Sequence, residues 1–144
     1  MRVLRRAAGL LLSLGLLYGC SQQAAATDDL IQSLTEAHSA IASSLLGIEL
    51  YEQHRSTRAV TETLLGDMVK QVSDAERSLE PVSISSEQIQ SERDATLAAV
   101  HASAAALLTS RDQLEQHGAV ANTADLETAA HQVDGLLDEL RGKQ

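Results

Sequence analysis

The chain has 144 residues, of which 44% are hydrophobic and 22% charged, as expected for one small globular domain. It contains no Trp or Phe, and its only strand-like run is the short segment 82–84, so the composition argues against β-sandwiches, β-barrels and sites built from aromatic platforms. The net charge of −9 argues against nucleic acid as a partner, because phosphate binding needs a basic surface.

The chain opens with a basic start and a short apolar run. Three arginines precede the apolar segment 7–17, which is too short to cross a bilayer and is typical of the core of a signal peptide. The run ends in Leu17-Tyr18-Gly19-Cys20, which resembles the lipobox of bacterial lipoproteins: Leu, a tolerant position, Gly or Ala, and an invariant Cys. Tyr18 departs from the pattern, since a small residue usually stands there.

The resemblance implies cleavage between Gly19 and Cys20, with diacylglycerol on the Cys20 sulfur and usually an acyl chain on its new amine. Two or three acyl chains make a durable membrane anchor. Cys20 is the only cysteine, so no intrachain disulfide is possible. The alternative is a stray thiol after an ordinary secretory signal. By the same resemblance, Ser21 after the cysteine implies an outer-membrane destination in a Gram-negative host. A Gram-positive host would hold the protein on the outer face of its plasma membrane.

Three segments follow from this interpretation. They are a signal peptide over 1–19, a lipidated cysteine and tether over 20–27, and a helical bundle domain over 28–144. Cleavage removes three arginines and no acidic residue, so the net charge changes from −9 to −12. Anionic lipid head groups would repel such a surface, and we expect the domain to hang from its anchor rather than lie on the membrane.

From residue 28 onward, apolar residues recur at helical spacing and predict four helices over about 28–54, 57–79, 86–116 and 123–141. The seams of the first two helices comprise Leu30, Leu34, Ala37, Ile41, Ser44, Ile48 and Tyr51, and then Val60, Leu64, Met68, Val72, Ala75 and Leu79. Those of the last two comprise Gln90, Arg93, Leu97, Val100, Ala104, Leu107, Arg111 and Leu114, and then Leu126, Ala130, Val133, Leu137 and Leu140.

Capping residues mark where these helices begin. Thr27 suits the N-cap of the first helix, and Ser56 or Thr57 that of the second. Pro81 stops the second helix, because proline disfavours helical geometry in the residue before it. The remaining signals are a capping box of Ser85 with Gln88 for the third helix and an N-cap at Asn122 or Thr123 for the fourth.

Short connections favour antiparallel neighbours, so the sequence predicts an all-α, up-down-up-down four-helix bundle. Two alternatives stay open, a three-helix bundle with an appended fourth helix and an elongated coiled-coil hairpin. In the predicted bundle, Gly47, Gly66 and Gly135 fall near one level. These glycines indicate either close packing and tolerated surface positions or a local widening that admits a ligand.

Five histidines raise the question of a metal site. The topology brings His54, His117 and His131 toward one end, with Glu127 four residues before His131, and imidazole with carboxylate could bind zinc or copper there. Histidines at helix ends are commonly only solvated. We therefore expect no bound metal, and the three histidines with Glu127 stay the alternative.

Four further side chains lie at or near the seams. His38 and His101 are expected to be partly buried and hydrogen-bonded, or at a seam edge, rather than ligands. Arg93 and Arg111 could reach the surface, pair with Glu across the bundle, or hold an anion. Glu49 and Glu52 lie one turn apart, which is usual on a solvated acidic face.

The sequence contains no nucleophile elbow, no glycine-rich phosphate loop and no acid–base pair, so we expect no catalysis. The leading hypothesis is a lipid-anchored envelope protein whose helical bundle is a structural or protein-interaction module. Its expected partners are the membrane, through the anchor, and an envelope protein. No cofactor is expected beyond the covalent lipid. The alternative is an extracytoplasmic bundle that binds a small ligand or a metal.

Overall fold

The computed structural model describes the backbone of residues 2–143 and the side chains of residues 23–143. The described backbone forms four α-helices and no strand: α1 (Arg2–Glu52), α2 (Arg58–Ser78), α3 (Glu87–His117) and α4 (Ala124–Arg141). The all-helical class and the four helices are therefore confirmed. No helix in the described part of the chain is long and apolar enough to cross a membrane.

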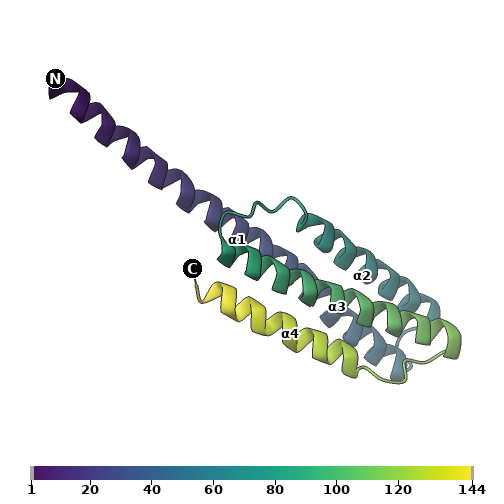
Figure 1. The fold of residues 1–144 in the computed structure, drawn as a ribbon. Helices are drawn as coiled ribbons and strands as arrows, with labels where there is room; N and C mark the ends of the chain where they lie inside the picture. The colour runs from purple at the N-terminus through teal and green to yellow at the C-terminus, as the bar shows by residue number, and fades with distance from the viewer. Residues whose placement is uncertain (1, 144) are drawn as a thin grey trace.

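The helices lie side by side, and each of α2, α3 and α4 runs back along the helix before it (Figure 1). Among the described residues, α1 and α3 each pack against all three other helices, whereas α2 and α4 do not touch. The helices α1 and α3 therefore lie diagonally opposite in the bundle and contact each other across its centre. Both bury many small side chains, among them Ala37, Ala40 and Ser44 on α1 and Ala99, Ser103 and Ala106 on α3. Small side chains allow helix backbones to approach closely, which suits the diagonal contact.

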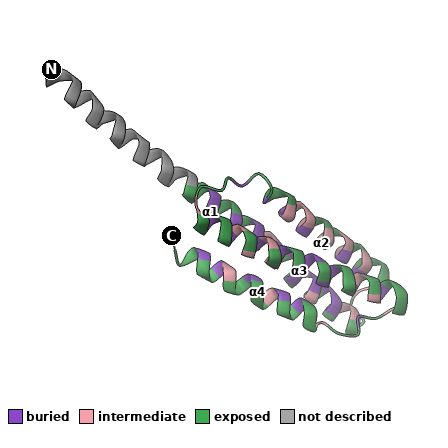
Figure 2. Cartoon of the chain, in the orientation of Figure 1, coloured by how far each residue is buried: buried purple, intermediate pink, exposed green. Residues whose placement is uncertain are grey.

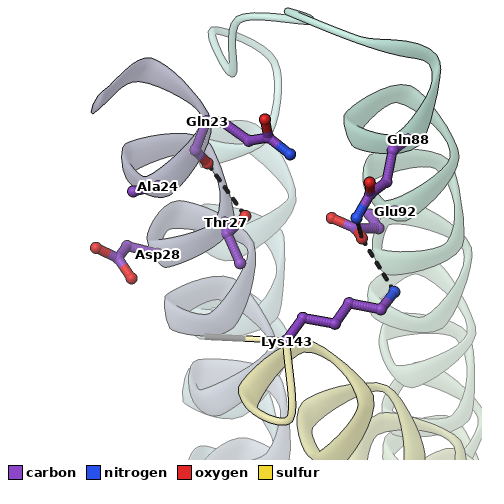
Figure 3. Close-up of a pocket in the computed structure, with 7 residues that line it drawn as sticks. All are labelled: Gln23, Ala24, Thr27, Asp28, Gln88, Glu92 and Lys143. Atoms are coloured by element: carbon purple, nitrogen blue, oxygen red, sulfur yellow. Dashed lines mark hydrogen bonds and ion pairs between the residues drawn. The ribbon is translucent and has the colours of Figure 1, made fainter. Parts of the chain in front are cut away.

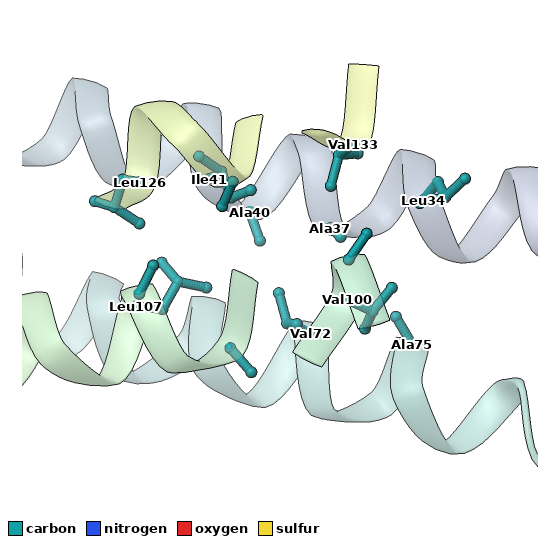
Figure 4. Close-up of a cluster of buried hydrophobic side chains, with 14 of the residues drawn as sticks. Leu34, Ala37, Ala40, Ile41, Val72, Ala75, Val100, Leu107, Leu126 and Val133 are labelled. Atoms are coloured by element: carbon teal, nitrogen blue, oxygen red, sulfur yellow. The ribbon is translucent and has the colours of Figure 1, made fainter. Parts of the chain in front are cut away.

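The core consists of aliphatic side chains from all four helices that point toward one another (Figure 4). Its members include Leu34, Val72, Val100 and Val133, one from each helix. The outward faces of the helices are exposed (Figure 2). The predicted seam of α1 is confirmed, because its first six residues are buried and Tyr51, the seventh, is partly buried.

The predicted seams of α2 and α3 are wrong in their first turns. Val60 is 61% exposed, and Thr61 and Leu65 lie in the core instead. On α3, Gln90 is exposed while Ile89 and its neighbours along the same face are buried. Three helical turns take 10.8 residues, so the correct seams place residues 61 and 72, or 89 and 100, eleven apart. The predicted seams instead place residues 60 and 72 twelve apart and residues 90 and 100 ten apart, so their first members lie off the buried face.

The first helix begins well before residue 28, its predicted start. Gln23 to Thr27 continue α1, and Ala26 is buried with 4% exposure. Thr27 is no N-cap, because its hydroxyl donates to the carbonyl oxygen of Gln23 at 3.1 Å. The alanines at 24–26 are strong helix formers, and no residue of the predicted tether interrupts the helix.

The other helix ends follow the sequence signals to within a few residues. Thr57 caps α2, accepting from the Val60 N–H at 3.3 Å. The N-cap of α3 is Ser86 rather than Ser85, since the Ser86 hydroxyl oxygen accepts from the Ile89 N–H at 3.2 Å. Gly118 ends α3 with a positive φ of 69°, a conformation that glycine adopts without strain.

The start of α4 combines the two predicted capping residues. Asn122 Oδ1 accepts from the Ala124 N–H at 2.9 Å, while Thr123 holds the N-cap position without a side-chain capping bond. The α4 seam is confirmed at Leu126, Val133, Leu137 and Leu140, and Ala130 is partly buried.

Candidate functional site

The predicted anchor lies outside the residues whose side chains are described. This applies to the signal peptide and to the lipobox of Leu17, Tyr18, Gly19 and Cys20. Cleavage and lipidation there stay predictions from the sequence.

The proposed metal ligands are not assembled into a site. His54 lies in the α1–α2 turn with a φ of 57°, His117 is the last residue of α3, and His131 is exposed on α4. Glu127 accepts a hydrogen bond from the Thr123 hydroxyl at 2.9 Å. Within residues 23–143, no group of three or more His, Cys, Asp and Glu side chains could hold a metal ion.

The two seam histidines each connect neighbouring helices. His38 Nε2 lies 3.1 Å from Asp134 Oδ1, which joins α1 to α4. His101 Nδ1 lies 3.3 Å from Glu76 Oε1, which joins α3 to α2. His38 is at the edge of its seam, as expected, whereas the His101 side chain is 74% exposed. Both contacts are pairs on the bundle surface.

The seam arginines also contact protein groups. Arg93 Nε donates to the Leu79 carbonyl oxygen at 3.0 Å and so caps the C-terminal end of α2. Arg111 Nε lies 3.4 Å from Glu115 Oε1 on its own helix rather than across the bundle. Glu49 accepts from the Gln53 amide at 2.8 Å.

The three glycines do not open a ligand cavity at one level. Gly47 is buried so closely against α2 that an added Cβ would overlap Leu64 Cδ2. Gly66 and Gly135 face open space, with nothing within 4 Å of an added Cβ. Close packing at Gly47 and tolerated surface positions at the other two account for all three.

A hollow at one end of the bundle is the feature that sequence reasoning missed. The start of α3 and the end of α4 meet here beside α1, and the three elements line an open space of about 540 Å³ (Figure 3). An adjoining space of about 360 Å³ between α3 and α4 shares Gln88, Glu92 and Lys143 with the first. We call the two spaces together the end hollow. Its first part is also lined by Gln23, Ala24, Thr27 and Asp28, and its second by Ser91, Ala95, Thr96, Leu136, Glu139 and Leu140.

A buried carboxylate lies at the centre of the end hollow. The Glu92 side chain is 8% exposed, and its Oε1 accepts from Gln88 Nε2 at 2.9 Å and from Lys143 Nζ at 3.0 Å. Lys143 Nζ also donates to Glu139 Oε1 at 2.8 Å. Its hydrogen bonds to Glu139 and Glu92 raise the pKa of Lys143 above its ordinary value, so the ammonium stays protonated at neutral pH.

No pattern in the sequence predicts this site. The predicted seam of the third helix passes through Gln90 and Arg93, and a one-residue change of phase is what turns Glu92 inward. Lys143 lies 51 residues further along the chain, and only the packing of α4 against α3 brings it to Glu92. A Glu–Lys pair so distant in sequence has no spacing signature.

Comparison with protein-family models, with curated proteins and with solved structures returns no significant match. The fold and the end hollow define the chain as an all-helical bundle with a buried, charge-paired carboxylate at one end.

Proposed function

We propose that this chain is a bacterial lipoprotein, held in the cell envelope by acyl chains on Cys20 after cleavage behind Gly19. The single observation that carries the proposal is the sequence Leu17-Tyr18-Gly19-Cys20, placed directly after a basic start and an eleven-residue apolar run over 7–17. The lipid holds the protein on the periplasmic face of the outer membrane in a Gram-negative host, or on the outer face of the plasma membrane in a Gram-positive one.

The domain behind the anchor is an up-down-up-down four-helix bundle that acts as a structural or protein-interaction module. Its acidic surface favours suspension from the lipid over contact with anionic head groups or nucleic acid. It needs no cofactor beyond the lipid and performs no catalysis. The lack of any group of three or more metal-ligating side chains within residues 23–143 supports this view over the metal-binding alternative.

Exposed apolar side chains indicate where a protein partner would bind. Four large apolar side chains among the described residues are exposed: Leu46 on α1 (56%), Val60 on α2 (61%), Leu108 on α3 (39%) and Ile84 in the α2–α3 connection (51%). The first three lie in the half of the bundle near the α1–α2 and α3–α4 connections, remote from the end hollow and from residue 20, whereas Ile84 lies at the opposite end. Apolar groups exposed at the free end of an anchored bundle favour a partner approaching from that side.

Site-specific photo-cross-linking in intact cells tests the interaction role. A photoreactive residue at Leu46 or Val60 should give a discrete adduct with an envelope protein, whereas one at Gln32, exposed on the part of α1 nearer the end hollow, should not. Adducts at none of these positions, or with lipid alone, would contradict it.

A further inference from the structure

One buried hydroxyl differs from all the others in the described core. The remaining buried hydroxyls, those of Ser33, Ser44, Thr61, Ser103 and Ser110, each donate to the carbonyl oxygen four residues earlier. Thr96 is 0% exposed, and its Oγ1 has no hydrogen-bond partner among the described residues. Thr96 is one of the residues that line the second part of the end hollow. An unpaired buried hydroxyl is costly, so a molecule in the hollow that bonds to it would relieve that cost.

The neighbouring carboxylate requires a cation. Glu92 lies one helical turn before Thr96 on the same face of α3 and is buried. A buried carboxylate is stable only when it is paired and hydrogen-bonded. Here Lys143 supplies the positive charge from beyond the end of α4, and its side chain is 40% exposed. The ammonium is therefore held by a flexible stem at the rim.

The remaining walls of the hollow suit an organic cation. Two carboxylates, those of Glu92 and Glu139, contact the single ammonium group of Lys143, so these three groups carry one net negative charge. Leu136 and Leu140 add an apolar wall. Lys143 itself shows what fits, because its ammonium contacts two carboxylates at 3.0 and 2.8 Å.

We propose that the end hollow is a binding site for a small primary-ammonium compound, and that Lys143 fills the site when the compound is absent. The bound ammonium takes the place of Lys143 Nζ between Glu92 and Glu139. The carbon chain of the compound lies along α4, and a polar group beside the ammonium bonds to the Thr96 hydroxyl. The inference does not depend on the anchor. The compound is either a soluble amine or the head group of an aminophospholipid.

Calorimetric titration of the protein, purified from its host in the form that accumulates there, tests this site. The probes are ethanolamine, putrescine and a short-chain phosphatidylethanolamine, with choline and the matching phosphatidylcholine as quaternary controls that cannot donate an N–H bond. We expect saturable binding of primary amines alone. Binding of the soluble amines identifies a solute site, and binding of the phospholipid alone identifies a head-group site. Binding of no primary amine, or equal binding of the quaternary compounds, would overturn the proposal.

Three variants assign the binding to the hollow. Lys143→Ala removes the tethered competitor and should tighten amine binding about ten-fold, whereas Lys70→Ala, which removes a lysine paired with Asp74 on the surface, should leave it unchanged. Glu92→Gln should abolish binding.

Thr96→Val removes no charge and provides an independent test if Glu92→Gln fails to fold. It should weaken binding several-fold while the free protein remains at least as stable as the parent. Unaltered amine affinity in both Lys143→Ala and Thr96→Val would show that the site is not this hollow.

Discussion

Gly47 and Gly135 both stand inside helices, but their surroundings differ. Gly47 is buried where α1 meets Leu64 of α2, and Gly135 faces solvent on α4. A glycine inside a helix costs about 1 kcal/mol relative to alanine, chiefly through backbone entropy. Only at Gly47 does a close approach explain why the smaller residue is present.

Alanine substitutions separate the two cases. Gly135→Ala should raise the free energy of unfolding by about 0.5–1 kcal/mol, because the new methyl group meets no atom. Gly47→Ala should show no such gain, since Leu64 must leave its position. When Gly47→Ala is made in a chain that already carries Leu64→Ala, the gain relative to that chain should return. Urea denaturation measures all three, and equal gains at both glycines would contradict the close packing.

At the level of single residues, the sequence predicts partners poorly. His38 and Arg93 are placed near seams correctly, but their partners Asp134 and the Leu79 carbonyl depend on tertiary packing. Glu92 could not be recognised as buried, because its inward orientation depends on a helix phase that differs from the predicted one by a single residue.

The start of α3 rests on a choice between two adjacent serines. Ser86 has an extended backbone, and its side chain accepts from the third residue of the helix, whereas Ser85 lies one residue too early to cap it. Ser86→Ala should therefore lower the free energy of unfolding by about 0.5–2 kcal/mol, and Ser85→Ala should change it little. Thermal denaturation of the two variants tests this, and equal losses would place the cap elsewhere.

The last turns of α2 carry a charged group with a pH-dependent contribution. Asp74 accepts a hydrogen bond from Lys70 at 2.8 Å and also pairs with Arg77. The hydrogen bond from Lys70 and the two positive charges lower the pKa of Asp74 below its ordinary value of 3.8. A carboxyl group with a lowered pKa stabilises the fold above the ordinary pKa, and this contribution is lost as the pH falls through the lowered value.

Asp74→Asn should consequently be less stable than the parent at neutral pH, by a small amount because the group is 43% exposed. The difference should shrink as the pH falls below about 4. Asp67→Asn, an exposed position on the same helix, is the matched control. Urea midpoints across this range decide it, and a deficit independent of pH would show that the carboxylate charge is not responsible.

At the level of elements, the helix ends and most of the core could be predicted. Capping residues, Pro81 and Gly118 are local signals, and the seams of α1 and α4 follow a regular spacing. The first turns of α2 and α3 could not be predicted, because several seams fit a mixed sequence and only packing selects one. The predicted start of α1 at residue 28 is wrong, because Thr27 suits an N-cap as well as a helix interior.

Across the whole molecule, the two ends of the bundle have different chemistry. The end nearer residue 20 holds the polar hollow around Glu92 and one exposed apolar side chain, Ile84, whereas the other half exposes Leu46, Val60 and Leu108. If the anchor is attached at Cys20, the hollow faces the membrane and the apolar side chains face away from it. The orientation of both surfaces thus depends on lipidation.

Intact-mass analysis of the membrane-fraction protein beside a Cys20→Ala variant tests that claim most directly. We expect a chain that begins at Cys20 and carries two or three acyl chains, and a variant that lacks them and leaves the membrane fraction. An unmodified Cys20 thiol, or a variant that stays membrane-bound and otherwise unchanged, would contradict the lipid anchor.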